Sequence, residues 1–543
     1  MPASDVPPAA AAPGAAALAA VQEDFFSFLA REFPTLCLHD EFIFFPRVSA
    51  AWENWFQLPH LESGFLESAA SRLAGLLSRL PRLAPEEDPG PLAEEAVLLR
   101  QSLESVRREL GPGGSWRQDP FLYLKAASLA WAPVLAQSSQ VDWRRREKLR
   151  ELLDQVARLF HRGRGQLEAI SQPAKLLTAG AFADARRFLG EVVPAFLAAQ
   201  VSGGGFEPGL RQVDEALCRL QETVAALPVT RALLGEAGLA EILANWGWTG
   251  GLEEIAGLLD EELAESQAAL AQLAHRIHPG RSWTAVLQSV AEPRGRTDRF
   301  SLYGREVAKL WDFWQNSPVL PRLTGRVVVA ETPIYLKSLR SSASYAAPWG
   351  PPEENPGYFY VTPETEDRRH HLLHHRFLSA HETVPGHHFL DATRLALASP
   401  LRRQYESPFF YEGWACYAET LLISEGYLHD PRELLVGWQR RLWRALRGRA
   451  DLDLQRGRLN LQGGLDLLRR AGYPEATARG QVLQLALTPG YQLCYTTGLR
   501  EILRLRDRFA PRLGLARFHE VLLSGGQLPF SLVARRLQAA SGL

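Results

Sequence analysis

Histidine is concentrated in one short stretch of this 543-residue chain. Of its 14 histidines, seven lie within residues 370–388. In that stretch, the sequence SAHETVPGHH places Glu382 directly after His381 in apolar, helix-like surroundings. A His followed by Glu begins the metal-binding helix of many zinc hydrolases, in which the His binds the metal and the acid reaches its water. The pattern therefore predicts a Zn2+ centre with His381 as a ligand.

The second metal ligand cannot stand four residues after His381, its usual place, because that residue is Pro385. On an ideal helix His387 would lie about 240° around from His381, at roughly 100° per residue. His388 would share the face of His381 but lie about 10.5 Å along the axis. Pro385 and Gly386 favour a widened or broken turn, which could return His387 to the face of His381. We predict His387 as the ligand, with His388 as the alternative or as a supporting residue.

The third protein ligand is expected on a later helix, in the sequence YEGWACYAETLL. Glu412 and Glu419 are seven residues apart and share one helical face, and apolar neighbours such as Trp414 would hold that helix in a core. A buried carboxylate is costly unless it is paired or bound to a metal. We predict Glu412 as the third ligand, which leaves one coordination position for water. Glu419 is predicted to orient a histidine ring, although a solvated surface acid fits its sequence equally well.

Two further histidine pairs have the four-residue spacing that can bind a metal on one helical face. They are His370 with His374 and His371 with His375. Neither pair has a Glu in the place that a hydrolase needs beside it. We therefore interpret these four residues as an exposed or supporting cluster.

The elements that must position these residues are mostly helices. Over residues 21–277 apolar side chains recur every three or four positions, as at Ala96, Leu99 and Leu103, which is typical of amphipathic helices. Over residues 325–362, GRVVVAETP and GYFYVT are β-branched or aromatic runs bounded by Gly and Pro, which predicts strands. Helical spacing then returns. The predicted fold is mainly α, a multi-helix zincin-like architecture with a small antiparallel β-sheet next to the active-site helix.

Length and punctuation predict one large domain. At about 150 residues per domain the chain could form several units, yet no Gly- or Pro-rich segment is long enough for an interdomain linker. We predict a single metallohydrolase-like domain over 21–543, with a helical half at 21–290 and the sheet and metal-site helices at 291–543. Residues 1–20, largely Ala broken by Pro and Gly, are predicted to be a disordered tail.

Composition and charge exclude several function classes. Lys and Arg number 60 against 61 Asp and Glu, so no net field favours nucleic acid or an anionic membrane. The four cysteines form no CxxC pair, which indicates neither a disulfide framework nor a thiolate metal site. The N-terminus lacks the pattern of a secretory signal, and no 18-residue apolar stretch occurs. We predict a cytoplasmic protein without nucleic acid or membrane partners, and leave its oligomeric state open.

Five sequence blocks in the C-terminal 200 residues resemble, in order, signature blocks of the bacterial domain-of-unknown-function 885 family. They are NPGYFYVTP, HETVPGHH, YEGWACYAE, TPGYQLCYTTGLREILRLRD and FHEVLLSGGQLP. That family looks related to the gluzincin metallopeptidases, so the resemblance implies a mostly helical fold and hydrolysis of peptide-like bonds at a zinc site. It implies His381, His387 and Glu412 as metal ligands, with Glu382 as the general base. It also implies Tyr495 as a phenol near the developing oxyanion, although a core tyrosine fits that position equally well.

The chain departs from the family pattern where polar groups are usual. Leu390 stands where the family tends to have Gln, two residues after the PGHH pair. A Glu-x-x-Arg-Tyr run is replaced over 481–485, where Gln484 stands. Gln455 stands where a His commonly follows Asp451. These differences leave the predicted ligands and base in place and predict a different choice of substrate.

The predicted function is a zinc-dependent peptidase for short peptides, in which Glu382 accepts a proton from the attacking water. Tyr495 or Arg500 would donate a hydrogen bond to the oxyanion. Either predicted strand could pair with the backbone of an extended peptide. Two other functions fit the sequence: a non-catalytic helical protein that binds metal or a partner, and a metallohydrolase of esters or non-peptide amides.

Overall fold

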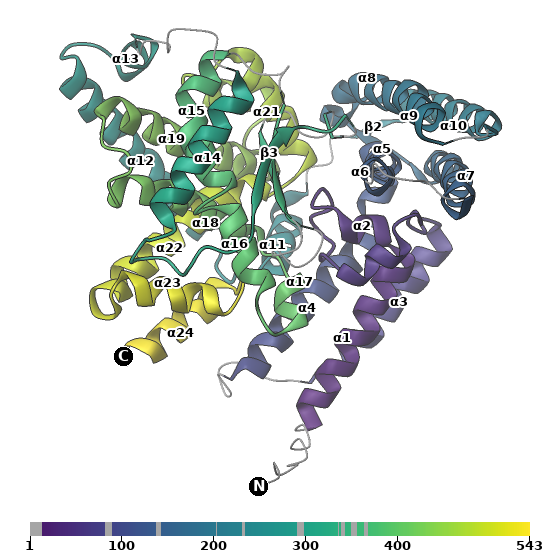
Figure 1. The fold of residues 1–543 in the computed structure, drawn as a ribbon, viewed down its shortest axis with the longest axis horizontal. Coiled ribbons are helices and arrows are strands. Elements are labelled where there is room, and N and C mark those ends of the chain that lie inside the picture. The colour runs from purple at the N-terminus through teal and green to yellow at the C-terminus, as the bar shows by residue number, and fades with distance from the viewer. Residues whose placement is uncertain are drawn as a thin grey trace.

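A computed structural model of the protein describes residues 13–81, 90–136, 143–201, 204–230, 234–289, 298–334, 336–337, 343–348, 356–362 and 368–542. Its elements are mostly helices, with two small sheets (Figure 1). The predicted mainly α fold with a small β-sheet is therefore confirmed. In Figure 1 most of the N-terminal helices, purple to blue, lie to the right, and the C-terminal helices, green to yellow, lie to the left.

The N-terminal half is almost entirely helical. Its elements are α1 (Pro13–Glu32), α2 (Pro34–Leu38), the 3-10 helix η1 (Ser49–Asn54), α3 (Ser63–Arg79), α4 (Pro91–Leu110), η2 (Ser115–Arg117), α5 (Pro120–Leu129), α6 (Ala132–Ala136), α7 (Trp143–Gln166), β1 (Ile170–Ser171), α8 (Gln172–Arg187), the π-helical turn η3 (Phe188–Val192), α9 (Val193–Gln200), α10 (Glu207–Ala226), β2 (Val229–Thr230), α11 (Gly235–Asn245), α12 (Leu252–Ile277) and α13 (Trp283–Ser289). In α4 the periodic residues Ala96, Leu99 and Leu103 are all buried, so apolar spacing predicted this helix and its inner face.

The start of α1 corrects the predicted N-terminal tail. Residues 1–12 lie outside the described residues, but residues 13–20 are the first turns of α1. Alanine has the highest helix propensity, and Leu18 and Val21 give this Ala-rich segment an apolar side that is buried in the core. Local composition alone suggested a tail, whereas burial of that side stabilises a helix.

The C-terminal half combines a three-stranded sheet with helices. Its elements are α14 (Arg299–Trp314), β3 (Val327–Glu331), β4 (Ser344–Ala346), β5 (Gly357–Val361), α15 (Arg368–Glu382), α16 (His387–Leu395), α17 (Pro400–Gln404), α18 (Pro408–Ser424), α19 (Pro431–Gln455), α20 (Leu461–Arg469), α21 (Glu475–Leu487), α22 (Tyr491–Leu513), α23 (Leu515–Ser524) and α24 (Phe530–Ser541). The sheet packs on α14 through Tyr303, whose ring meets that of Phe359 edge-on at 5.3 Å between centroids.

The topology of this sheet differs from the antiparallel arrangement predicted. The strand order is β3–β5–β4; β4 and β5 are antiparallel, but β3 and β5 are parallel. The two predicted strands, β3 and β5, do pair with each other. They run parallel and not antiparallel because the chain reverses direction twice between them, once on each side of β4, a strand that the sequence analysis did not predict. Since β5 is hydrogen-bonded on both sides, its backbone has no edge for a substrate peptide, and the prediction that it pairs with one is wrong.

Two glycines let α18 and α22 cross closely. A Cβ on Gly413 would lie 2.6 Å from the Cα of Gly498, and a Cβ on Gly498 would collide with the carbonyl oxygen of Phe409. Only glycine therefore permits this approach at either position. The crossing places the first turns of α22, with their two tyrosines, beside the start of α18.

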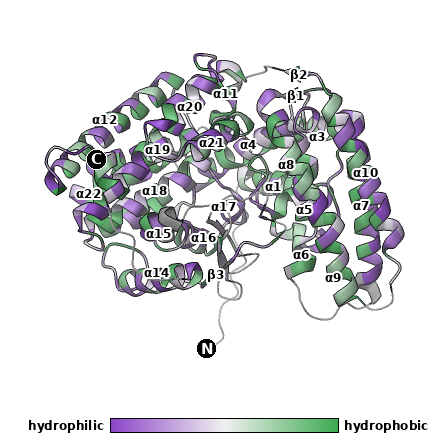
Figure 2. Ribbon diagram, turned by 90° about the horizontal axis from the view of Figure 1, so that it is seen from above, coloured by the Kyte–Doolittle hydropathy of each residue, from purple (hydrophilic) through white to green (hydrophobic). Residues whose placement is uncertain are grey.

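The buried residues connect both halves of the chain. One cluster of buried apolar side chains extends from Leu18 to Leu537, and a second small cluster lies under the three-stranded sheet. Figure 2 shows most helices with an apolar side and a polar side, as expected for helices packed around a core. None of the helices within the described residues combines the length and the apolar character needed to span a membrane.

Candidate metal centre

The turn between α15 and α16 brings His381 and His387, the first two histidines of HETVPGHH, together. The helix breaks at Pro385, whose carbonyl oxygen accepts a 2.8 Å hydrogen bond from Nε1 of Trp414. Gly386 is required next, because a Cβ there would collide with the carbonyl oxygen of His381. The rings of His381 and His387 end 4.7 Å apart, centroid to centroid, at an interplanar angle of 81°. The broken turn predicted from Pro-Gly is therefore present.

Three predicted ligands converge on one point. His381, His387 and Glu412 each offer one ligand atom, and these atoms lie within 4.8 Å of one another. Oε2 of Glu412 is 3.5 Å from Nε2 of His381 and 3.6 Å from Nε2 of His387. All three residues are buried. Among the described residues, this is the one group of its kind.

The geometry of this cluster fits a zinc ion. In a tetrahedral site with metal–ligand bonds of about 2.1 Å, ligand atoms lie about 3.4 Å apart, close to the two distances to Glu412. Oε2 of Glu412 is buried and has no hydrogen-bond partner. Burial raises the pKa of Glu412, but hydrogen bonds and charge from His381 and His387 lower it by more. The net pKa of this carboxyl is well below its usual value. The centre thus presents a carboxylate and two imidazoles to a common point.

His388, the alternative ligand, lies outside this cluster. Its Nδ1 is 3.2 Å from the hydroxyl of Tyr345, and its ring packs 6.0 Å from that of Trp311. Tyr345 belongs to β4, so the strand that the sequence did not reveal borders the centre. The structure therefore places His387 with the other ligands and His388 in a supporting position against the sheet.

Glu419 lies behind His381, where it was predicted to orient a ring. Its Oε1 is 3.0 Å from Nδ1 of His381, and it accepts hydrogen bonds from Arg440 and Arg444 at 2.6 to 3.0 Å. Burial raises the pKa of Glu419, while the two arginines lower it well below its usual value. Glu419 is placed to accept a proton carried on Nδ1 of His381, and that tautomer leaves the lone pair of Nε2 available to a metal ion.

Three tyrosines enclose the ligands. The hydroxyl of Tyr491 donates to Oε1 of Glu412 at 2.7 Å, the ring of Tyr411 stacks on His387 at 4.0 Å, and the ring of Tyr495 lies parallel to that of His381 at 6.5 Å. Burial and the charge of Glu412 raise the pKa of both Tyr491 and Tyr495 well above the usual value. Both phenols therefore stay protonated and can donate. The sequence singled out only Tyr495, although the NPGY-like block TPGYQLCY also contains Tyr491.

Glu382, the predicted base, is the last residue of α15 and directly follows His381. Its side chain is buried, as is that of His381. The end of α15 therefore places Glu382 next to His381 along the chain, just before the turn at Pro385.

Arg500, predicted as an oxyanion donor, is not at the centre. Its guanidinium pairs with Glu261, Glu262 and Glu265 of α12, because α22 turns that residue toward the neighbouring helix. The guanidinium beside Tyr495 is instead that of Arg447, 4.8 Å above its ring.

The comparison with family models identifies the chain. Residues 57–537 match the family described as "Bacterial protein of unknown function (DUF885)". The chain belongs to this family. No curated protein matches it.

Two solved structures share the fold. One is "a putative lipoprotein of unknown function from Shewanella oneidensis", with a TM-score of 0.76 at 17% identity over 97% of this chain and 99% of that one. The other is "the putative lipoprotein from Colwellia psychrerythraea", with a TM-score of 0.72 at 16% identity over 96% of this chain and 99% of that one. At these identities the likeness shows the fold alone.

These two structures also overturn the predicted cytoplasmic location, because both proteins are described as putative lipoproteins. That prediction rested on an N-terminus without the pattern of a secretory signal and on the lack of an 18-residue apolar stretch in the sequence. Neither property determines where a folded domain of this family is found.

The positions that depart from the DUF885 pattern lie around the centre and not within it. Gln455 is buried, and its Oε1 accepts from the backbone of Leu234 at 3.4 Å. Leu390 is buried in the core. Gln481 accepts a 3.2 Å bond from the Arg447 that covers Tyr495, whereas Gln484 is exposed. None of the three residues of the candidate cluster is among these positions.

The remaining histidines form no second centre within the described residues. The side chains of His370 and His371 lie outside the described residues. His374 is buried and stacks on Tyr473 at 5.7 Å, so it is packed and not exposed. His375 is half-buried, and burial lowers its pKa.

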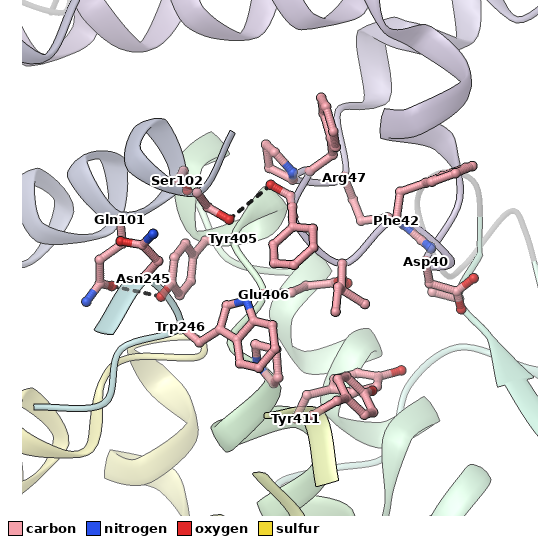
Figure 3. A pocket seen from close by; sticks show the side chains of 18 of the residues that line it. Asp40, Phe42, Arg47, Gln101, Ser102, Asn245, Trp246, Tyr405, Glu406 and Tyr411 are labelled. Atoms are coloured by element: carbon pink, nitrogen blue, oxygen red, sulfur yellow. Dashed lines mark hydrogen bonds between the residues drawn. The ribbon is translucent and has the colours of Figure 1, made fainter. Parts of the chain in front are cut away.

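A pocket lies beside the metal centre, between the two halves of the chain (Figure 3). Its cavity volume is about 80 Å³. Its walls come from the loop at residues 40–47, from α4, from the end of α11 and from residues 405–411, and Tyr491 closes one side. Figure 3 shows the rings of Trp246, Tyr405 and Tyr411 around this space. No sequence pattern indicated this pocket, because the segments that form its walls meet only in the folded chain.

Proposed function

We propose that this protein is a zinc-dependent hydrolase that cleaves short peptides, with His381, His387 and Glu412 as metal ligands and Glu382 as the general base. One observation carries the proposal: two imidazole nitrogens and a buried carboxylate oxygen without a hydrogen-bond partner face one another at the separation that zinc requires. A buried carboxylate without a cation is costly, which is why a bound metal is the best account of Glu412.

The roles of the residues follow from their positions. Zinc, when bound, lowers the pKa of water in its fourth coordination position to about 7 and polarises a carbonyl oxygen. Glu382 accepts the proton of the attacking water and returns it to the leaving amine. Tyr495, protonated and beside His381, donates to the oxygen on which negative charge develops. Glu419 fixes the tautomer of His381.

The donor set also supports a relation to gluzincin peptidases. Two histidines come from one helix–turn–helix segment and the glutamate from a later helix, and the acid next to the first histidine is the base in that class. In that class the two histidines are four residues apart on one helix. In this chain they are six residues apart, and the Pro-Gly turn between them brings their rings together. A pocket of limited volume beside the centre favours short peptides over folded proteins as substrates.

Metal content and turnover test the proposal together. Purified protein should bind about one zinc per chain, and His381→Ala should lose it, whereas His161→Ala, an exposed site on α7, should not. Glu382→Gln should keep its zinc and lose hydrolysis of a peptide library, with exposed Glu191→Gln as the matched control. A Glu382→Gln variant that hydrolyses as fast as the parent would show that another group is the base. A folded parent that binds no zinc would favour a non-catalytic protein.

A further inference from the structure

The pocket and the metal centre share two walls. Tyr411 lines the pocket and stacks on His387, with ring centroids 4.0 Å apart. Tyr491 also lines the pocket, and its hydroxyl donates to Glu412 at 2.7 Å. The pocket and the ligands thus have two tyrosines in common, so the pocket adjoins the centre. A group bound in the pocket is close enough to the centre to be the end of the molecule that is cleaved there.

The charged side chains of the pocket favour a cation. Asp40, Asp391 and Glu406 line it together with one guanidinium, that of Arg47. A second guanidinium, of buried Arg394, donates to Asp391 at 2.8 and 3.0 Å and to Glu406 at 2.9 Å. Three carboxylates against two guanidinium groups leave one excess negative charge. An ammonium group would neutralise it, whereas a ligand carboxylate would add a fourth anion beside these three.

The electrostatic balance at Glu406 agrees with this preference. Burial raises the pKa of Glu406 even though Arg394 and Arg47 oppose the shift. Burial thus outweighs the two guanidinium groups at this carboxyl, and Asp391 and Asp40 add to the upward shift of its pKa. A ligand ammonium would add positive charge there, and Oε1 of Glu406 would keep its bond to Arg394.

The rest of the wall is aromatic. Phe44 and Trp246 stack with centroids 6.1 Å apart, Trp246 meets Tyr491 edge-on at 6.3 Å, and Tyr405 is anchored by a 2.8 Å bond to Gln101. Such rings pack against large apolar side chains, and their faces also attract ammonium groups. The pocket thus offers both an apolar surface and an anionic one.

We propose that this pocket binds the N-terminal residue of a peptide, with its free α-ammonium group among Asp40, Asp391 and Glu406 and its side chain against the aromatic rings. This inference rests on the proposed function, and it makes that function an aminopeptidase activity, because the pocket lies next to the ligands. The substrate class is a short peptide with a free amino terminus and a large apolar first residue.

Binding measurements on the full-length Glu382→Gln protein loaded with zinc test the inference without requiring turnover. The probes are Phe-Gly-Gly, its N-acetyl derivative and its C-terminal amide, titrated by calorimetry. N-acetylation should weaken binding by about tenfold or more, because it removes the charge that the carboxylates need. Amidation should change binding less than about threefold. The reverse pattern would mean that Arg47 binds the C-terminal carboxylate, and would overturn the inference.

Variants assign the effect to the pocket. Glu406→Gln in the same background should weaken Phe-Gly-Gly by about tenfold and leave the acetylated peptide unchanged; Asp40→Asn, in the loop before η1, serves the same purpose if the first variant fails to fold. Exposed Glu191→Gln is the control. Failure of all three peptides to bind would also overturn the inference. If Glu382→Gln binds the peptides with this pattern but the parent protein hydrolyses no peptide, the proposed function is wrong and the assignment of the pocket as a site for a peptide N-terminus stands.

Discussion

Glu412 and Glu419 lie on the same face of α18, seven residues apart, and both are buried. Glu419 accepts four hydrogen bonds from two arginines of α19. Glu412 receives one, from Tyr491, and its other oxygen has no hydrogen-bond partner but faces two imidazoles. The two acids are equally buried but differ in their partners. Two arginines pair with Glu419, whereas the proposed zinc would be the cation of Glu412.

The largest expected effect is on the acid that lacks a protein cation. Glu412→Gln should weaken zinc binding by more than about 100-fold, since it removes the only anionic ligand, and should abolish hydrolysis. The metal-free variant should lose less stability than Glu419→Gln does, because the partners of Glu412 are two imidazoles and a phenol and not two guanidinium groups. Zinc content and thermal unfolding of the metal-free forms measure both effects. Strong destabilisation of the metal-free variant would mean that Glu412 has a structural role like that of Glu419.

Glu419→Gln should reduce the stability of the fold more, and zinc affinity less, than Glu412→Gln does. It leaves Arg440 and Arg444 buried without their anion, which costs about 3 to 5 kcal/mol of unfolding free energy. Zinc affinity should fall by about 10- to 100-fold, because His381 loses the group that orients it. Denaturant unfolding and a zinc competition titration measure these two changes. If stability is unchanged, the arginines are satisfied elsewhere and the comparison between the two acids fails.

The two tyrosines of α22 sharpen the comparison at the ligand itself. Tyr491→Phe removes the hydrogen bond to Glu412 and should lower zinc affinity by about tenfold, as expected for a bond to a charged group. Tyr495→Phe should leave zinc affinity unchanged and lower kcat, because its hydroxyl acts on the substrate. Each variant is the control for the other. Equal effects of both on zinc affinity would contradict separate roles.

Local spacing predicted the parts of the centre that are close in sequence. The His-Glu pair and the Pro-Gly turn lie within eight residues, so helix geometry alone indicated that His387 needed a broken turn to approach His381. The helical half and the inner face of α4 followed from periodicity in the same way. These features depend on neighbours in the chain, which a sequence displays directly.

Features that depend on distant packing were missed. Tyr491 reaches Glu412 only because Gly413 and Gly498 let two helices cross closely. Arg500 follows Tyr495 by five residues on the same helix, yet its guanidinium pairs with acids of α12 and not with the centre. The parallel pairing of β3 with β5 and the pocket walls likewise arise from segments far apart. No periodicity encodes such contacts, so the sequence could name residue types there but not their partners.

A third buried acid, Asp451 of α19, extends the comparison to the start of α22. Its carboxylate accepts bonds from the backbone N–H groups of Gly490 and Gln492, both at 3.2 Å, and so positions the turn that carries Tyr491. Burial raises its pKa to about 7, although these amides oppose the shift. Like Glu412, it lacks a protein cation, but its partners are neutral donors.

The pH dependence of stability tests this third acid and is the smallest effect. Because its folded-state pKa is above the unfolded value, Asp451 stabilises the fold at low pH, and this contribution is lost as pH rises to about 7. Asn does not ionise, so Asp451→Asn should not lose stability as pH rises through 7, whereas the parent should. The unfolding free energy of the variant relative to the parent should therefore rise by about 1 kcal/mol between pH 6 and pH 8. Denaturant unfolding at both pH values measures it, with exposed Asp466→Asn as the control. A relative stability that does not change with pH would mean that the backbone amides suffice to keep Asp451 ionised, as the arginines do for Glu419.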